Sequence, residues 1–243
     1  MVLRQNMPDG QGKETNIFAD KEDGMSKHTQ LTQIIDMARR ISDEGLSAGR
    51  SGNISMRHGD GMFITPTGMA SADLHPSDIV YVDQKGRWSE AGLKPSSEWH
   101  FHHAIYQKRL DAHCIIHTHS PMATSLACAR MPIPAFHYMV AGLGGREIPC
   151  CGYELFGTDA LAVAIISTIG SQYHGCLMGG HGSIAFAGDA PMAFERAELI
   201  EELAGMYLRL KQFDPNPPLL TDEQMDEVLA KFEGYGQQSH AKV

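Results

Sequence analysis

Alternation of helical segments with short apolar runs is the feature of this sequence that most limits its fold. Apolar residues recur at helical spacing from Leu31 to Ile41, between Ser26 and Gly45, and this pattern predicts an amphipathic helix. Further helices are predicted over 96–110, 122–129, 158–170, 191–213 and 223–232, and short strands over 54–56, 62–65, 79–82, 112–119, 175–178 and 183–187. Because helices and strands alternate along most of the chain, the sequence predicts an α/β fold.

The first residues differ in composition from the rest. Residues 1–25 are rich in Gly, Asp, Lys and Asn, with isolated apolar residues such as Ile17 and Phe18, and they cannot bury enough apolar surface to order themselves. We therefore predict a flexible N-terminal tail over 1–25 and a single α/β domain over 26–243.

Charge and composition exclude several classes of function. The formal net charge is -9, and no basic stripe with interleaved aromatic residues is present, which argues against nucleic-acid binding. No apolar run is long enough to cross a bilayer, and no secretory signal is apparent. The five cysteines form no CxxC pair, and adjacent Cys150 and Cys151 are interpreted as small packing residues. We expect a cytoplasmic protein with reduced thiols and no membrane contact.

Three histidines form a candidate metal site. His117 and His119 are two residues apart in a predicted strand, so both side chains project from the same face. Alone, such a pair among 13 histidines is equally well explained by two surface residues. His181 lies within Gly179-Gly180-His181-Gly182, where glycines allow a close approach of the backbone to a site. Three imidazoles leave a fourth position open on a zinc ion, as in catalytic sites.

Hydroxyl and glycine clusters provide candidate anion donors. They comprise Ser51-Gly52-Asn53-Ile54-Ser55, Thr65-Pro66-Thr67-Gly68 and Pro95-Ser96-Ser97-Glu98. Each alone is typical of a turn or a helix cap, whereas together they supply N–H and hydroxyl donors suited to a phosphate. Glu98 is explained equally well as part of a cap, or as a metal ligand and base. The histidines at 100, 102 and 103 are interpreted as mostly solvated or packing residues.

The combination of these motifs resembles the class II aldolase/adducin superfamily, most closely its fuculose-phosphate aldolase branch. The resemblance spans roughly Leu31 to Gly236 and rests on SGNIS, ITPTG, PSSEWHFH, IIHTHS, IPAFHYM, IPCCGYELFGT, GGHGS and TDEQMDEVLAKFEGYG. It implies a three-layer α/β/α fold with a central, mainly antiparallel mixed sheet. It also implies a homotetramer with its active sites between neighbouring subunits.

The resemblance also assigns roles to individual residues. It implies Zn²⁺, or another divalent ion such as Mn²⁺ or Co²⁺, held by Glu98, His117, His119 and His181, with Glu98 also carrying a proton. It implies a substrate phosphate site, formed by Asn53, Thr67, Gly68, Ser96 and Ser97. Tyr138 matches a tyrosine that protonates the aldehyde oxygen across the interface, although a buried core tyrosine is the alternative. Phe156 and Tyr235 match residues that line the aldehyde side of the pocket.

The implied reaction is the reversible cleavage of a ketose 1-phosphate to dihydroxyacetone phosphate and lactaldehyde, acetaldehyde or a methylthio-aldehyde. Two departures from the fuculose-phosphate aldolases lie beside ligands: Thr118 between the first two histidines, and Gly180 before His181. The His-Thr-His-Ser run resembles the pentulose-5-phosphate 4-epimerases of the same fold, whereas Glu98 and the HYM segment favour an aldolase. A non-catalytic adducin-like interaction module is the remaining alternative.

Overall fold

The central sheet orders the whole molecule. The computed structural model describes residues 26–232 and 234, and in this part seven strands lie in the order β3-β2-β1-β4-β7-β6-β5. They are β1 (Asn53–His58), β2 (Gly61–Ile64), β3 (Val80–Val82), β4 (Cys114–Thr118), β5 (Cys150–Cys151), β6 (Gly175–Met178) and β7 (Gly182–Ala187). Only the β5–β6 pairing among them is parallel. The predicted mixed, mainly antiparallel sheet is confirmed, whereas the predicted tail over 1–25 lies outside the described residues.

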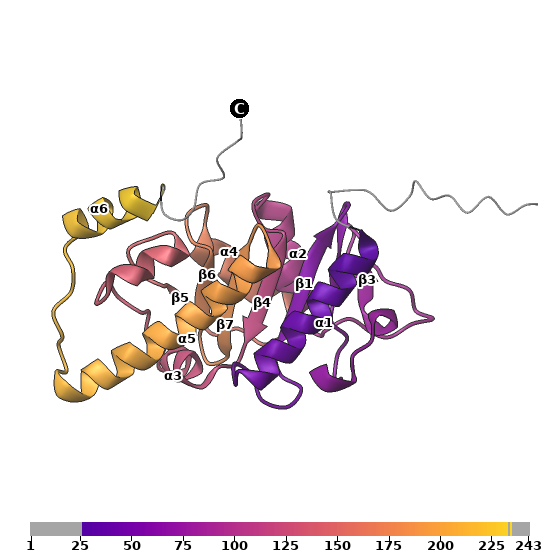
Figure 1. Ribbon diagram of the computed structural model, residues 1–243, viewed down its shortest axis with the longest axis horizontal. Helices are drawn as coiled ribbons and strands as arrows, with labels where there is room; N and C mark the ends of the chain where they lie inside the picture. Colours follow the sequence, from indigo (N-terminus) through magenta and orange to yellow (C-terminus); the bar gives the residue numbers. More distant parts are fainter. Residues whose placement is uncertain (1–25, 233, 235–243) are drawn as a thin grey trace, which may run out of the picture.

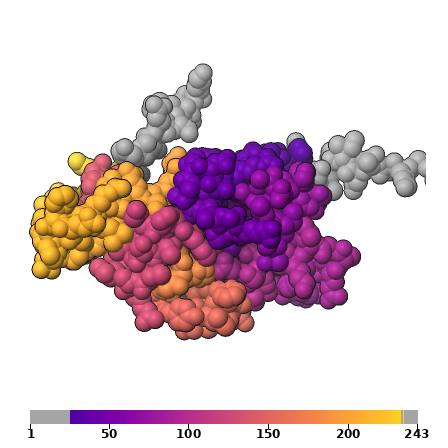
Figure 2. Space-filling view, turned by 90° about the horizontal axis from the view of Figure 1, so that it is seen from below, coloured from indigo at the N-terminus to yellow at the C-terminus, as the bar shows by residue number. Residues whose placement is uncertain are grey.

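Helices cover both faces of the sheet, so the fold has three layers (Figure 1). One face carries α1 (Lys27–Asp43), α3 (Pro121–Ala129) and α5 (Ala190–Phe213), and the other carries α2 (Trp99–Lys108) and α4 (Asp159–Ile169). The remaining elements are the short helices η1 (Ser71–Asp73), η2 (Pro76–Asp78) and η3 (Tyr138–Leu143), and the final helix α6 (Asp222–Phe232). Figure 2 shows the last segments, in yellow and orange, at one end of the molecule and earlier segments, in magenta, at the other.

The period-two pattern of the strands separates two apolar cores. In β4, Cys114 and Ile116 belong to the core beneath α1, α3 and α5, whereas Ile115 belongs to the core beneath α2 and α4. His117 continues the alternation, and its ring meets the ring of Phe101 from α2 edge-on, with centroids 5.5 Å apart. The alternation that fills the cores therefore turns His117 towards α2.

Most predicted elements are present, with two informative differences. The turn at 83–86 is confirmed by the bond from the Gly86 N–H to the Asp83 carbonyl, at 2.9 Å. The helix predicted from residue 96 begins at Trp99, because 94–96 is an extended segment that pairs with 65–67. Strand β5 was not predicted, since two residues are too few for a periodic signal. Within the described ranges, no helix is long and apolar enough to cross a membrane.

Candidate metal centre and substrate site

His117 and His119 meet at the end of β4. Their Nε2 atoms lie 2.9 Å apart, and the ring of His117 is fully buried. Nδ1 of His117 donates to the Ser183 carbonyl of neighbouring β7, at 2.8 Å. With the proton on Nδ1, the Nε2 lone pair of His117 faces the cluster, which is the arrangement that supports a metal-binding imidazole.

The tight connection between β6 and β7 brings His181 to the same point. Gly180 has a φ of +69°, and the His181 N–H donates to the Met178 carbonyl at 3.0 Å. A side chain on Gly182 would place its Cβ 2.4 Å from the Thr118 carbonyl oxygen and 3.0 Å from the ring of His119. The two glycines therefore permit the close approach that places the three imidazole rings with their centroids 4.7 to 5.0 Å apart.

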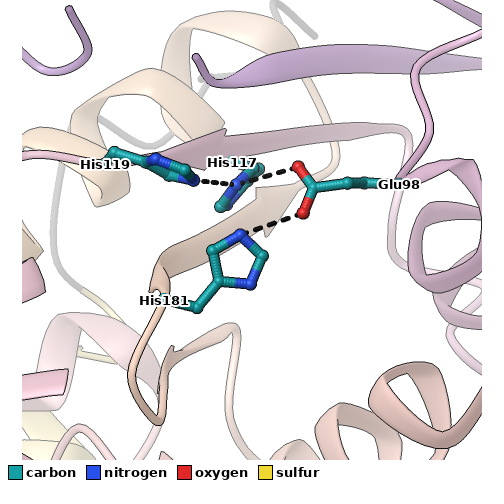
Figure 3. Close-up of side chains that lie close together, drawn as sticks. All are labelled: Glu98, His117, His119 and His181. Atoms are coloured by element: carbon teal, nitrogen blue, oxygen red, sulfur yellow. Dashed lines mark hydrogen bonds and ion pairs between the residues drawn. The ribbon is translucent and has the colours of Figure 1, made fainter. Parts of the chain in front are cut away.

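Glu98 completes the cluster from the start of α2. It occupies the position before the helix, but its side chain makes no capping hydrogen bond. Its carboxylate instead lies 3.2 Å from Nε2 of His117 and 2.9 Å from Nε2 of His181 (Figure 3). The cap interpretation of Glu98 is therefore excluded by the geometry.

These four side chains fit a single cation. One ligand atom from each of Glu98, His117, His119 and His181 lies within 4.8 Å of the others. Tetrahedral ligands of Zn²⁺ at their usual bond lengths lie about 3.4 Å apart, in the same range. Oε1 of Glu98 is buried beside Nε2 of His181, and the bare Nε2 of His117 faces the other carboxylate oxygen. Such a convergence of lone pairs and negative charge is stabilised by a cation between them.

The protonation states suit this role. Burial raises the pKa of the Glu98 carboxyl, but attraction to His117 and His181 outweighs burial and holds the pKa well below its usual range. Burial, followed by the charges of His117 and His181, lowers the pKa of His119 to about 4. For His117, burial lowers the pKa, but the neighbouring Glu98 carboxylate raises it above its ordinary value. The site thus presents an ionised carboxylate and at least one neutral imidazole near neutral pH.

The three hydroxyl and glycine clusters meet beside Glu98. Pro66 and Pro95 form an antiparallel bridge, and the Thr67 N–H donates to the Lys94 carbonyl at 3.1 Å. Oγ1 of Thr65 accepts a bond from the N–H of Ile54, at 3.2 Å, which joins the start of β1 to the same region. The residues predicted to bind phosphate, Asn53, Thr67, Gly68, Ser96 and Ser97, thereby come from three segments held together by backbone contacts.

The positions of Asn53 and Arg50 differ from what the sequence predicts for the phosphate site. The Asn53 amide donates from Nδ2 to Oε2 of Glu98, at 2.9 Å, so it directly contacts the candidate metal centre. Arg50 is the one charged residue among those lining a recess beside Asn53 and Thr65. The predicted phosphate site consists of N–H and hydroxyl donors, whereas the structure also places a guanidinium at the margin of this recess.

The candidate aldehyde-side residues are exposed. Tyr138 begins η3 and is 50% exposed, which excludes the alternative of a buried core tyrosine. Phe156 is 60% exposed and lies in the connection between β5 and α4. In that connection, a Cβ on Gly157 would lie 2.8 Å from the Ser97 carbonyl, so the segment passes directly over the hydroxyl cluster. Tyr235 lies outside the described residues.

Two residues near the cluster were missed by sequence reasoning. His102 is fully buried and hydrogen-bonded to Asn53 and Ser55, and is not solvated. Tyr153 lies against Gly180, where a Cβ would be 3.2 Å from its ring, next to His181. For His102, a signal was available in the sequence: Glu98 and His102 are four residues apart, a spacing that places side chains on one helical face.

Comparisons with known proteins agree with this geometry. Residues 32–208 match the family model described as Class II Aldolase and Adducin N-terminal domain, and the chain belongs to this family. It is 44% identical over 203 residues to the 5-methylthioribulose-1-phosphate/5-deoxyribulose-1-phosphate aldolase of Rhodospirillum rubrum, which covers 84% of this chain and 90% of the relative. It is 39% identical over 212 residues to the L-fuculose phosphate aldolase of Escherichia coli K12. This match covers 87% of this chain and 98% of the relative.

The fold comparison points in the same direction. A solved structure of an L-fuculose 1-phosphate aldolase superposes with a TM-score of 0.80 at 34% identity, covering 84% of this chain and 96% of that chain. The named relatives are aldolases, which are lyases. The class defined by fold and site is thus a class II aldolase, and the two curated relatives are named as aldolases of sugar phosphates.

Proposed function

We propose that this protein is a Zn²⁺-dependent aldolase that reversibly cleaves a deoxyketose 1-phosphate into dihydroxyacetone phosphate and a small aldehyde in the cytoplasm. The observation that carries this proposal is the convergence of Glu98 and three histidines directly beside hydroxyl-rich segments. The similarity to aldolases of methylthioribulose, deoxyribulose and fuculose phosphates supports the choice of substrate class.

His117, His119 and His181, together with Glu98, are the residues that would hold the ion. A bound divalent cation, Zn²⁺ or alternatively Mn²⁺ or Co²⁺, supplies Lewis-acid polarisation of a substrate carbonyl without any redox change. The contact of His117 with the Ser183 carbonyl fixes the tautomer of the His117 ring. The Ser47 hydroxyl accepts a hydrogen bond from the backbone N–H of His119, at 2.9 Å. These contacts hold the ligands in place before substrate arrives.

Glu98 is the proton carrier in this proposal. In the direction of synthesis it removes a proton from the hydroxymethyl carbon of dihydroxyacetone phosphate, and in the direction of cleavage it returns that proton to the same carbon. Its low pKa makes it ionised and ready to accept, and its position among the imidazoles places it beside any substrate held there. Its carboxylate therefore serves as a ligand at rest and as a base in turnover.

The hydroxyl and glycine segments bind the substrate phosphate. Ser96 and Ser97 lie just before Glu98 and the start of α2, where the helix dipole favours an anion. The antiparallel contact between 65–67 and 94–96 brings Thr67 and Gly68 close to these serines. Asn53 lies at the start of β1 and contacts Glu98. Binding of the phosphate here orients the three-carbon half of the substrate next to Glu98.

The aldehyde half is handled by exposed aromatic residues. We assign proton donation to the aldehyde oxygen to the partner subunit's Tyr138 in a homotetramer with interfacial active sites. The exposure of Tyr138 suits a residue that acts on a neighbouring subunit. Phe156, and Tyr235 from the end of the chain, would line the pocket for a methyl or methylthio group. The apolar exposed side of Phe156 suits such a group.

The proposal is tested by incubating the zinc-loaded protein with 6-deoxyketohexose, 5-deoxypentulose and 5-methylthiopentulose 1-phosphates. Release of dihydroxyacetone phosphate is coupled to a NADH-dependent dehydrogenase, and the protein treated with chelator is the control. We expect release from at least one substrate only with the ion present. No release from any of them contradicts the aldolase.

The same preparation separates the alternatives. A pentulose-5-phosphate 4-epimerase would interconvert its epimers without releasing a three-carbon product, and this would be observed by NMR of the sugar phosphate. A protein that binds neither ion nor phosphate would instead be an adducin-like module. We expect neither outcome, since the four candidate ligands, of which Glu98 and His117 are buried, converge in one cluster.

A further inference from the structure

A chain of buried hydrogen bonds runs behind Glu98, away from the three histidines. Oε2 of Glu98 accepts from Nδ2 of Asn53 at 2.9 Å, and Oδ1 of Asn53 lies 2.5 Å from Nε2 of His102. Nδ1 of His102 lies 2.8 Å from the Ser55 hydroxyl, which in turn lies 2.9 Å from the Tyr106 hydroxyl. All five side chains are buried. The chain joins Glu98 to the centre of α2 through two residues of β1.

The direction of the bonds from Ser55 to Glu98 is determined by their chemistry. A carboxylate only accepts, so the NH2 group of Asn53 must face Glu98, and its carbonyl oxygen must face His102. His102 therefore donates from Nε2 and, as a neutral ring, accepts at Nδ1 from Ser55. The Tyr106 hydroxyl faces both the Ser55 hydroxyl and, at 3.4 Å, the His113 carbonyl. The hydrogen bonds from Ser55 onwards thus all point towards Glu98, and none of them can be reversed without leaving a buried group unpaired.

The setting of His102 supports a neutral ring with a fixed tautomer. Burial, followed by the charge of nearby His117, lowers the pKa of His102 to about 3. Its side chain has no exposed surface, so it contacts neither solvent nor substrate directly. Its two hydrogen bonds go to Asn53 and Ser55, which are two residues apart on one face of β1.

We propose that His102 is a positioning residue for Glu98, because it fixes the Asn53 amide in the one orientation whose NH2 group holds the carboxylate. Without the donor at His102, the amide can rotate so that its oxygen faces Glu98 and repels it. Asn53 also starts β1 opposite His117, so one residue links the metal centre to the predicted phosphate site. The catalytic consequence rests on the proposed aldolase function, whereas the effect on ion binding does not.

The test compares three variants of the full-length protein. His102→Leu removes the donor, His102→Gln keeps an N–H near the position of Nε2, and His103→Leu is the matched control. His103 is the next residue of α2 and contacts the Gln84 carbonyl, outside the chain of hydrogen bonds. Affinity for Zn²⁺ is measured by competition with a chromophoric chelator, and kcat and KM are measured with a cleaved ketose 1-phosphate.

We expect His102→Leu to weaken Zn²⁺ binding by about tenfold and to lower kcat of the saturated enzyme by about 10- to 100-fold, the usual range for partners of metal ligands. KM should change by less than the fall in kcat, because the predicted phosphate donors other than Asn53 remain unchanged. His102→Gln should recover most of both losses, and His103→Leu should match the original protein.

Two results would overturn the proposal. The first is a His102→Leu protein whose melting temperature falls while its ion affinity and kcat stay unchanged. The second is a His102→Gln protein as defective as His102→Leu, which would mean that the ring volume matters and the donor does not. If His102→Leu does not fold, His102→Asn replaces it, because the shorter amide cannot reach Asn53. The ion affinity of His102→Asn should then fall below that of His102→Gln. Equal ion affinities of these two variants would also overturn the proposal. If the original protein cleaves no substrate, the aldolase fails, while the affinities still decide the role of His102.

Discussion

The candidate metal centre and the exposed aromatic residues Tyr138 and Phe156 are built in different ways. Glu98 and His117 are buried, and their polar atoms contact other fixed groups of the fold. Tyr138 and Phe156 are at least half exposed, on η3 and on the connection after β5. The first region is complete within one chain, whereas the second leaves apolar and phenolic surface available to a substrate or a neighbouring subunit.

This difference separates two kinds of candidate functional residue. Groups that must hold an ion and move a proton are preorganised by packing, since their geometry has little tolerance. Groups that contact the variable half of a substrate are attached to exposed segments, which tolerate change. We expect substitutions in the buried cluster to abolish turnover, and substitutions in the exposed segments to alter its rate or its selectivity.

Loss of an ion ligand should have the largest effect. His117→Ala removes the most buried imidazole of the cluster and leaves Glu98 with one of its two imidazole neighbours. Lewis-acid stabilisation contributes several kcal/mol, so turnover should fall by about a thousandfold or more. The ion content should fall in parallel, as measured by atomic emission after gel filtration. A variant that keeps both its ion and its activity would remove His117 from the site.

Glu98→Gln should separate proton transfer from ion binding. The amide preserves shape but cannot take up a proton, so kcat should fall by about 10² to 10⁴, the usual contribution of a general base. Three histidines remain, so this variant should retain more Zn²⁺ than His117→Ala. Undiminished turnover with the ion bound would exclude Glu98 as the proton carrier.

Tyr138→Phe should have a smaller effect, of about 100-fold on kcat, because only one proton donor is lost. Its exposure makes a large loss of stability unexpected, and the melting temperature serves as the control. If Tyr138 acts across an interface, mixing and reassembling Tyr138→Phe with Glu98→Gln should restore activity at sites that combine both intact residues. No recovery from reassembled mixtures would place Tyr138 in the site of its own chain, or outside any site.

Phe156→Ala should have the smallest effect and should depend on the substrate. A phenyl ring that is only partly covered contributes a fraction of the 1.5–3 kcal/mol of full burial, so we expect KM to rise by about threefold to tenfold. The increase should be larger for a methylthio than for a methyl aldehyde half. An equal effect on both would show that Phe156 does not contact this half of the substrate.

The sequence predicted the candidate ligands better than the hydrogen bonds around them, because the ligands depend on local spacing and those hydrogen bonds depend on the packing of the core. His117 lies in β4 and His119 directly follows it, so the period-two spacing was a local signal for this pair. The positive φ of Gly180, next to His181, is likewise a local feature that favours glycine. Glu98 and His102 are four residues apart on α2, and Asn53 and Ser55 are two apart on β1, so each pair was visible. The packing of one face of α2 on one face of β1 depends on the whole core. Local residue spacing therefore could not predict that these two pairs meet.

The most direct test of the account is a titration of the metal-free protein with Zn²⁺, with release of dihydroxyacetone phosphate measured at each addition. The four converging ligands predict that activity rises linearly and reaches its maximum at one ion per chain. In the same titration, His117→Ala should stay inactive at that ratio. Full activity without added ion, in protein shown to contain none, would contradict the central claim.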